Sequence, residues 1–273
     1  MFKNSSDNIN LCLKGKDTWL FLGNGYADII DKLQGGVKLS GLKLNRLTEK
    51  YVKIKEMSEI VGAEFYMFIG PNKSSVYPEY LPPIVFPSTQ RYLSPLFKSL
   101  KEKGVDVYDP TLALIKAKQV SSTFFYYKTD THWNSLGGYL AFEGFRELIG
   151  LPSLPPLSFI DGPPVNGDLI NIGGYVNFPL SSATNDNPLS VWATPLNVIE
   201  EEQGLAINSN PISDKIVWIF GDSFNIALKP YFIAMFKEIH IFKHRNFEKI
   251  ISSERPKPDL IVWIIVERNV DEI

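Results

Sequence analysis

The sequence is poor in the residues that crosslink proteins or bind metals. Its 273 residues include one cysteine, Cys12, and three histidines. A single cysteine excludes an internal disulfide and a zinc site built from cysteines. Three scattered histidines do not form a His-rich metal site. We therefore expect no metal and no bound cofactor.

Long apolar runs and an excess of charge of one sign are also missing. No stretch approaches 18 consecutive apolar residues, so the sequence predicts no direct insertion into a membrane. The first 16 residues lack the pattern of a signal peptide, which places the protein in the cytoplasm if Met1 is the native start. Lys and Arg number 28 against 30 Asp and Glu, a balance that gives no indication of a nucleic-acid partner.

The chain does contain enough apolar residues for a large core, at 44% hydrophobic and 13% aromatic. Short apolar runs alternate with segments of helical periodicity. The expected strands are 19–22, 65–69, 105–108, 124–127, 216–220, 239–242 and 260–266. The expected helices are 41–61, 92–103, 110–118, 134–149, 225–237 and 246–252. This alternation predicts one α/β domain over residues 1–273, with helices on both faces of a mostly parallel sheet.

The composition changes between residues 151 and 213. This segment holds nine of the 19 prolines and has no sustained periodicity. We interpret it as a loop-rich insertion with short strands, since long loops in compact domains are often functional. Its aromatic residues Phe159, Tyr175, Phe178 and Trp192 favour an ordered lid or a binding wall.

An acid, an imidazole and a hydroxyl follow predicted strands. Asp130 and His132 come after the run 124–127, and Ser223 comes after 216–220. Ligands bind at the carboxyl ends of parallel strands. These residue types are the parts of a Ser-His-Asp nucleophile system. A simpler interpretation also fits, in which Asp or Ser caps a helix and the histidine is satisfied in the core.

Other polar residues near predicted strand ends are candidates for substrate contact. Lys73 and Tyr77 follow the strand 65–69 and either bind a sugar or acyl donor or belong to an ordered surface loop. Arg268 follows the last strand and either anchors Asp130, binds a substrate carboxylate or faces solvent. Trp133 and Tyr175 are further candidates, although packing explains Trp133 as well. His244 is a weaker rival for the base, and His240 is expected at the surface or a sheet edge.

Five segments together resemble the alginate O-acetyltransferase family, a branch of the Ser-Gly-Asn-His hydrolase superfamily. The resemblance runs from about residue 15 to the C-terminus. In chain order the segments are Gly15–Phe21, Pro71–Pro82, Thr129–Asn134, Gly167–Leu169 and Gly221–Phe224. The resemblance implies a flavodoxin-like three-layer α/β/α domain, with Ser223 as nucleophile, His132 as base and Asp130 as its orienting acid.

The superfamily also builds its oxyanion hole with a glycine and an asparagine from later strand ends. The backbone N–H of Ser223 is one candidate donor here. No clear glycine block follows Ser223, and Asn246 and Asn269 are the nearest asparagine candidates. The second donor is therefore open at this point.

The resemblance implies transfer of acetyl onto a hydroxyl of a bacterial capsular or exopolysaccharide, through an acetyl-serine. The expected partners are a polysaccharide or oligosaccharide acceptor and an acetyl donor. Family members usually act outside the cytoplasm with a membrane protein that delivers acetyl, whereas a cytoplasmic version would use acetyl-CoA. Two alternatives use the same fold. One is a carbohydrate acetyl esterase with water as acceptor, and the other is a non-catalytic carbohydrate-binding protein.

Overall fold

The computed structural model describes residues 10–175, 186–201 and 204–272. The strands are β1 (Cys12–Lys14), β2 (Leu20–Leu22), β3 (Glu64–Gly70), β4 (Asp106–Tyr108), β5 (Leu157–Asp161), β6 (Pro188–Trp192), β7 (Val198–Glu201), β8 (Leu205–Asn208), β9 (Ser213–Gly221), β10 (Phe236–Phe242) and β11 (Leu260–Val266). The α-helices are α1 (Ile29–Gln34), α2 (Gly41–Ile60), α3 (Lys73–Val76), α4 (Ser94–Glu102), α5 (Thr111–Lys118), α6 (Ser135–Leu148), α7 (Asp168–Ile172), α8 (Asn225–Met235) and α9 (Phe247–Ile251).

A seven-stranded sheet in the order β4-β3-β11-β9-β10-β8-β7 forms the centre of the molecule. The first five of these strands run parallel, and β8 and β7 extend the sheet antiparallel. In the register, Val266 of β11 lies opposite Gly70 of β3, and Ile264 lies opposite Gly221 of β9. The carboxyl ends of three neighbouring strands therefore meet at one edge.

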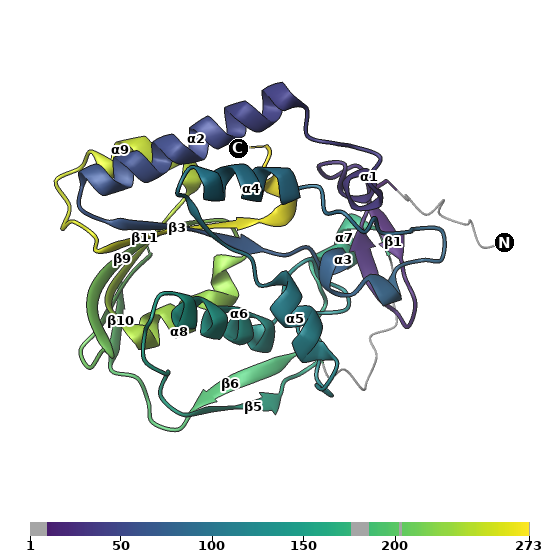
Figure 1. The fold of residues 1–273 in the computed structure, drawn as a ribbon. Coiled ribbons are helices and arrows are strands. Elements are labelled where there is room, and N and C mark those ends of the chain that lie inside the picture. Colours follow the sequence, from purple (N-terminus) through teal and green to yellow (C-terminus); the bar gives the residue numbers. More distant parts are fainter. Residues whose placement is uncertain (1–9, 176–185, 202–203, 273) are drawn as a thin grey trace.

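Helices cover both faces of this sheet (Figure 1). Side chains alternate between the faces along β11: Trp263 and Ile265 pack in the cluster that contains α2, α4 and α9. Val262 and Ile264 pack in the cluster with α5, α6 and α8. Because successive side chains of a strand point to opposite faces, an unbroken apolar run fills two cores. The predicted three-layer, mostly parallel α/β fold is confirmed.

One predicted strand is absent from the described structure. Residues 124–127 form only an isolated bridge between Tyr126 and Trp133. Side chains supply the remaining partners: Phe125 N donates to the hydroxyl of Tyr77, and Asn134 Nδ2 donates to the carbonyl of Phe124. The apolar run is thus a largely buried loop whose backbone groups form hydrogen bonds with side chains. The sequence analysis also did not predict the short elements β1 and α1.

The segment 151–213 has more regular structure than loops alone. β5 and β6 form an antiparallel pair, and β6 packs against α6. β7 and β8 join the central sheet, so part of the segment belongs to the core architecture. The described part of the segment includes Phe159, Tyr175 and Trp192, whereas Phe178 lies outside the described residues.

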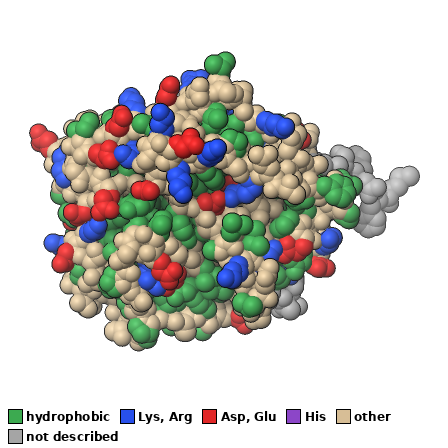
Figure 2. All heavy atoms as spheres, in the orientation of Figure 1, with side chains coloured by type: hydrophobic (Ala, Val, Ile, Leu, Met, Phe, Trp, Pro, Cys, Tyr) green, Lys and Arg blue, Asp and Glu red, His purple; other side chains and the backbone are tan. Residues whose placement is uncertain are grey.

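The surface bears both signs of charge. Acidic and basic side chains are interspersed on the face drawn in Figure 2. Among the described residues, no helix has the length and apolar character needed to cross a bilayer.

The close approach of β3 to the turn after β9 leads to a stability prediction. A Cβ at Gly70 would lie 2.4 Å from Cδ1 of the Phe224 ring. Gly70→Ala should therefore lower the free energy of unfolding by about 1–3 kcal/mol, as overpacking does. Gly41→Ala is the control, because a Cβ there meets nothing within 4 Å and alanine favours helix by up to about 1 kcal/mol. Urea unfolding measures both, and equal midpoints for the two variants would contradict the packing account.

Candidate active site

Ser223 lies in the turn that joins β9 to α8. Asp222 holds this turn, because its Oδ1 accepts from Phe224 N at 2.9 Å and its Oδ2 accepts from Val266 N at 2.8 Å. The N-cap position of α8 is Phe224, and no side chain caps the helix there. The capping interpretation of Ser223 is therefore wrong, and its exposed hydroxyl is available for another partner.

That partner is His132. Its Nε2 lies 2.7 Å from Ser223 Oγ, and its Nδ1 lies 2.6 Å from Asp130 Oδ1. The backbone N–H of His132 donates to the same carboxylate at 2.9 Å, which fixes the imidazole relative to Asp130. This geometry fits the tautomer with the proton on Nδ1, which leaves Nε2 to accept from the serine. The structure thus brings the three predicted residues into one hydrogen-bonded chain.

The carboxylate of Asp130 is prepared for an ionised state. Burial alone would raise its pKa, but hydrogen bonds from the His132 ring, Asp168 N and His132 N lower the pKa of Asp130 to about 2. Hydrogen bonds to the charged form of a carboxyl favour that form. Asp130 is consequently an anion at any pH at which the protein is expected to work.

Asp168, the first residue of α7, supports this arrangement and received no role from the sequence. Its backbone N–H donates to Asp130 Oδ2 at 2.9 Å. Its carboxylate accepts from Thr131 N at 2.8 Å and from Thr131 Oγ1 at 2.6 Å. Gly167 permits the approach, because a Cβ there would lie 2.2 Å from the carbonyl oxygen of Thr129. The segment Gly167–Leu169 is one of those that carry the family resemblance, but its position in the sequence did not show that Asp168 contacts Asp130.

Lys73 and Tyr77 do not lie where a substrate contact would need them. Their exposed fractions are 4% and 2%. The Tyr77 hydroxyl accepts from Phe125 N at 2.9 Å, and Lys73 Nζ donates to three carbonyl oxygens of the segment 127–130. Burial lowers the pKa of Lys73 to about 7. The structure corrects both predictions: these side chains support the loop from inside.

A pocket of about 350 Å³ opens beside Ser223. Its lining residues are Tyr127, Asp130, His132, Trp133, Ser135, Val165, Ser223, Ile226, Ala227 and Pro230. Trp133 is almost fully buried and donates from Nε1 to the carbonyl of Phe224 at 3.0 Å, so it mainly packs the wall. Tyr175, another predicted substrate contact, does not line this pocket, and Lys14 Nζ lies 4.6 Å from the centre of its ring.

The residues considered for the oxyanion hole are spread apart. Within the described part of the chain, the backbone N–H of Ser223 has no hydrogen-bond acceptor. Asn246 is exposed next to Phe247, which packs on the α2 face of the sheet. Asn269 follows β11 in a short 3-10 helix. As far as the described residues go, neither asparagine lines the pocket beside Ser223.

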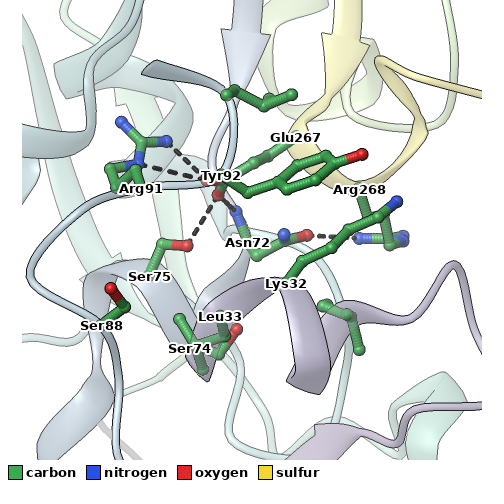
Figure 3. Close-up of a pocket in the computed structure, with 12 residues that line it drawn as sticks. Lys32, Leu33, Asn72, Ser74, Ser75, Ser88, Arg91, Tyr92, Glu267 and Arg268 are labelled. Carbon is green, nitrogen blue, oxygen red and sulfur yellow. Dashed lines mark hydrogen bonds and ion pairs between the residues drawn. The ribbon is translucent and has the colours of Figure 1, made fainter. Parts of the chain in front are cut away.

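Arg268 lies in a second, polar cavity at the carboxyl ends of β3 and β11 (Figure 3). There Arg91, Ser75 and the backbone N–H of Asn72 converge on Glu267. Arg268 itself makes no ion pair with a described residue, and its guanidinium donates to Asn72 Oδ1 at 3.4 Å. Burial lowers its pKa, with partial compensation from Asp222.

Arg268 also borders the catalytic side of this region. Its guanidinium carbon lies 5.6 Å from the ring centre of Phe224, which in turn contacts the His132 ring at 5.1 Å. With Asn72, it lines a smaller cavity that reaches Thr131. A half-buried cation without a described counter-ion is unusual, and the two cavities leave the Arg268 guanidinium open on one side.

The other two histidines are held away from Ser223. His244 stacks on Trp263 at 4.4 Å and lies 3.0 Å from the carbonyl oxygen of Ile264. His240 is buried beside Glu238 and not at the surface or a sheet edge as predicted. β8 pairs with β10 on that side, and the rings of Trp218 and Phe242 pack near the imidazole.

Asp130, His132 and Asp168 place potential metal-ligand atoms within 4.8 Å of one another. Their atoms are already engaged, since His132 Nδ1 bonds to Asp130 and the Asp168 carboxylate accepts from Thr131. A cation would have to replace these hydrogen bonds, so the donor set fits a proton-transfer site better than a metal centre.

The chain is similar to known acetyltransferases. The family model described as an SGNH hydrolase-like domain, acetyltransferase AlgX, matches residues 12–150. The O-acetyltransferase domain of Pseudomonas putida AlgJ superposes with a TM-score of 0.65 at 17% identity, covering 96% of this chain and 93% of that one. Bacillus cereus PatB1 gives 0.64 at 15%, covering 95% and 97%.

Pseudomonas aeruginosa AlgX gives a TM-score of 0.57 at 14% identity, covering 94% of this chain and 62% of that one. At these identities, the structural likeness demonstrates a shared fold. Comparison with curated protein sequences gives no match.

The lowered pKa of Asp130 predicts how stability depends on pH. The carboxyl has a pKa of about 2 in the folded protein, below its ordinary value of 3.8. Its contribution is therefore complete above about pH 4 and is lost as the pH falls through 2. In urea unfolding between pH 5 and 2, the wild type should lose stability more steeply than Asp130→Asn. Parallel curves for the two proteins would contradict the assigned hydrogen bonds.

Proposed function

Because the chain belongs to the AlgX acetyltransferase family of SGNH hydrolase-like domains, we propose that it transfers acetyl onto a hydroxyl group of a polysaccharide through an acetyl-serine at Ser223. The observation that carries the proposal is the hydrogen-bonded chain from Asp130 through His132 to Ser223. Its three members stand in the order that general-base activation of a serine requires.

In the first step, His132 Nε2 takes the proton of Ser223 Oγ while Oγ attacks the carbonyl carbon of the acetyl donor. The Ser223 backbone N–H stabilises the resulting oxyanion. When the intermediate collapses, the bond to the donor's leaving group breaks, and that group takes the proton from His132. Asp130 stays ionised throughout and stabilises the imidazolium.

In the second step, a sugar hydroxyl attacks the acetyl carbon and gives its proton to His132. Collapse of this intermediate releases the acetylated sugar, and the proton returns to Ser223 Oγ. Acceptor and donor enter through the pocket beside Ser223, where Tyr127, Ile226 and Pro230 provide apolar surface. Acetyl-CoA and an acetyl-delivering membrane protein are the two donor sources that experiments need to separate.

A carbohydrate acetyl esterase is the second candidate, because Ser223 is exposed and water can reach an acetyl-serine there. The chemistry differs only in whether water or a sugar attacks the acetyl group. A non-catalytic binding protein is disfavoured, since Ser223 Oγ contacts His132 instead of capping α8.

Removal of the nucleophile or the base tests the proposal. Ser223→Ala and His132→Ala should each lower acetyl transfer at least about 10³-fold, as loss of a triad member does, while circular dichroism shows a retained fold. Acetyl-sugar and free acetate are measured together, with p-nitrophenyl acetate as donor. Near-normal transfer by either variant would refute the assignment, and acetate without acetyl-sugar would favour the esterase.

The guanidinium of Arg268 is proposed to bind a polar or anionic group of the acceptor. Arg268→Gln should raise the KM for an oligosaccharide acceptor about 10-fold and leave kcat within about threefold, because a contact made equally in ground and transition states affects KM alone. Arg255→Gln is the matched control, since Arg255 also stacks on a ring, that of Phe242, but is exposed. An unchanged KM for Arg268→Gln would remove this residue from the binding site.

A further inference from the structure

Lys73 is a charged residue in the interior of the protein. It begins α3, which Pro71 and Asn72 separate from the end of β3, and its exposed fraction is 4%. Lysine is almost never fully buried unless it is paired, and within the described residues the hydrogen bonds of Lys73 Nζ go to carbonyl oxygens and not to a carboxylate. The carboxylates of Asp130, Asp168 and Asp186 favour its charge from a distance, so direct hydrogen-bond partners of another kind must replace the lost hydration of its ammonium group.

Backbone carbonyls provide that compensation. Lys73 Nζ donates to Tyr127 O at 3.0 Å, Lys128 O at 2.9 Å and Asp130 O at 2.6 Å. An ammonium group has three donors and no acceptor, so every donor is used on one short segment of the chain. The rings of Trp19 and Phe21 lie 5.5 and 5.3 Å from Nζ and enclose it, as expected of cation–π contact.

The segment that Lys73 holds is the one that presents the acid and the base. The backbone carbonyl of Asp130 accepts from Lys73, and its carboxylate bonds to the His132 ring. One residue therefore joins the two interactions. The segment does not belong to a strand, and sheet hydrogen bonds do not fix it. Its remaining anchors include Leu20 N, which donates to Lys128 O, and Asp186, which accepts from Lys128 N.

We propose that Lys73 is a positioning residue for acyl transfer, whose ammonium group gathers three carbonyls of the segment 127–130 and so keeps the Asp130 carboxylate on Nδ1 of His132. The inference rests on the proposed function, because it assigns a task within the same site. Lys73 does not touch the substrate or the reacting atoms. It acts through backbone placement, and displacement of a catalytic group by about 1 Å costs about 100-fold in rate.

The test uses Lys73→Met, which keeps the length and apolar stem of the side chain and removes the donors. Lys118→Met is the matched control, because Lys118 also donates to a backbone carbonyl, that of Val76, and lies 4.9 Å from the ring centre of Tyr77. With p-nitrophenyl acetate, Lys73→Met should lower kcat by about 10- to 100-fold, as misplacement of a catalytic group does, with KM within about threefold. Lys118→Met should stay within about twofold in both.

A spectroscopic signature separates positioning from a general structural role. The Nδ1 proton of His132, shared with Asp130 at 2.6 Å, should give a low-field ¹H resonance that is absent in His132→Ala. Because the chain has only three histidines, the assignment is direct. This resonance should disappear or move in Lys73→Met and remain in Lys118→Met, with thermal unfolding as the check on folding.

The outcomes are distinguishable from failure of the proposed function. If Ser223→Ala retains activity, the serine mechanism fails whatever Lys73 does. If Ser223→Ala is inactive but Lys73→Met keeps both its kcat and the resonance, the positioning role alone is refuted. Lys73→Gln, which retains an amide donor, should fall between Met and wild type in kcat. Loss of the fold in both Lys73 variants would place the role of the residue in the core and would also overturn the proposal.

Discussion

The hydrogen bond between His132 Nε2 and Ser223 Oγ joins segments 91 residues apart, and the function of the site depends on it. Neither residue lies inside a strand or helix that would fix it alone. The parallel sheet positions Ser223, because β9 and β11 end at the same edge and the Asp222 carboxylate accepts a hydrogen bond from Val266 N. His132 lies on a loop that belongs to no strand, so other hydrogen bonds must hold it in place.

That loop is held from several directions by polar groups in the interior. Lys73 Nζ donates hydrogen bonds to its carbonyl oxygens. The Asp168 carboxylate accepts from the Thr131 hydroxyl, and the Asp168 backbone N–H donates to Asp130. Gly167 has no Cβ, which allows its backbone to lie close to that of Thr129. Buried polar groups are stable when they are satisfied, and satisfied networks are rigid. The site therefore combines an exposed serine with a histidine whose support is hidden from solvent, which suits the proposed transfer, in which two substrates enter in turn.

Much of this arrangement was readable from the sequence. The apolar run at β11 and its alternation with helices predicted the sheet, and the end of β9 predicted the place of Ser223. Asp130 and His132 do meet Ser223 as their residue types predicted, but the strand expected before them is a loop. Contacts that depend on three dimensions were not readable. Lys73 looks like a surface residue in a loop rich in Ser and Pro, and nothing in its spacing shows that three carbonyls surround it. The prediction of an exposed or edge position for His240 was wrong for a similar reason. The strand β8, which pairs with β10 beside it, lies in the segment 151–213, whose sequence has no sustained periodicity.

The most direct measurement is intact-protein mass spectrometry after mixing the protein with acetyl-CoA and, separately, with p-nitrophenyl acetate, followed by peptide mapping. The account predicts one added acetyl group on Ser223 from at least one donor, absent from Ser223→Ala. A donor preference for acetyl-CoA would also identify the acetyl source. An acetyl group on another residue, or none from either donor with an oligosaccharide absent and present, would contradict the claim that the His132–Ser223 contact activates the serine for acetyl transfer.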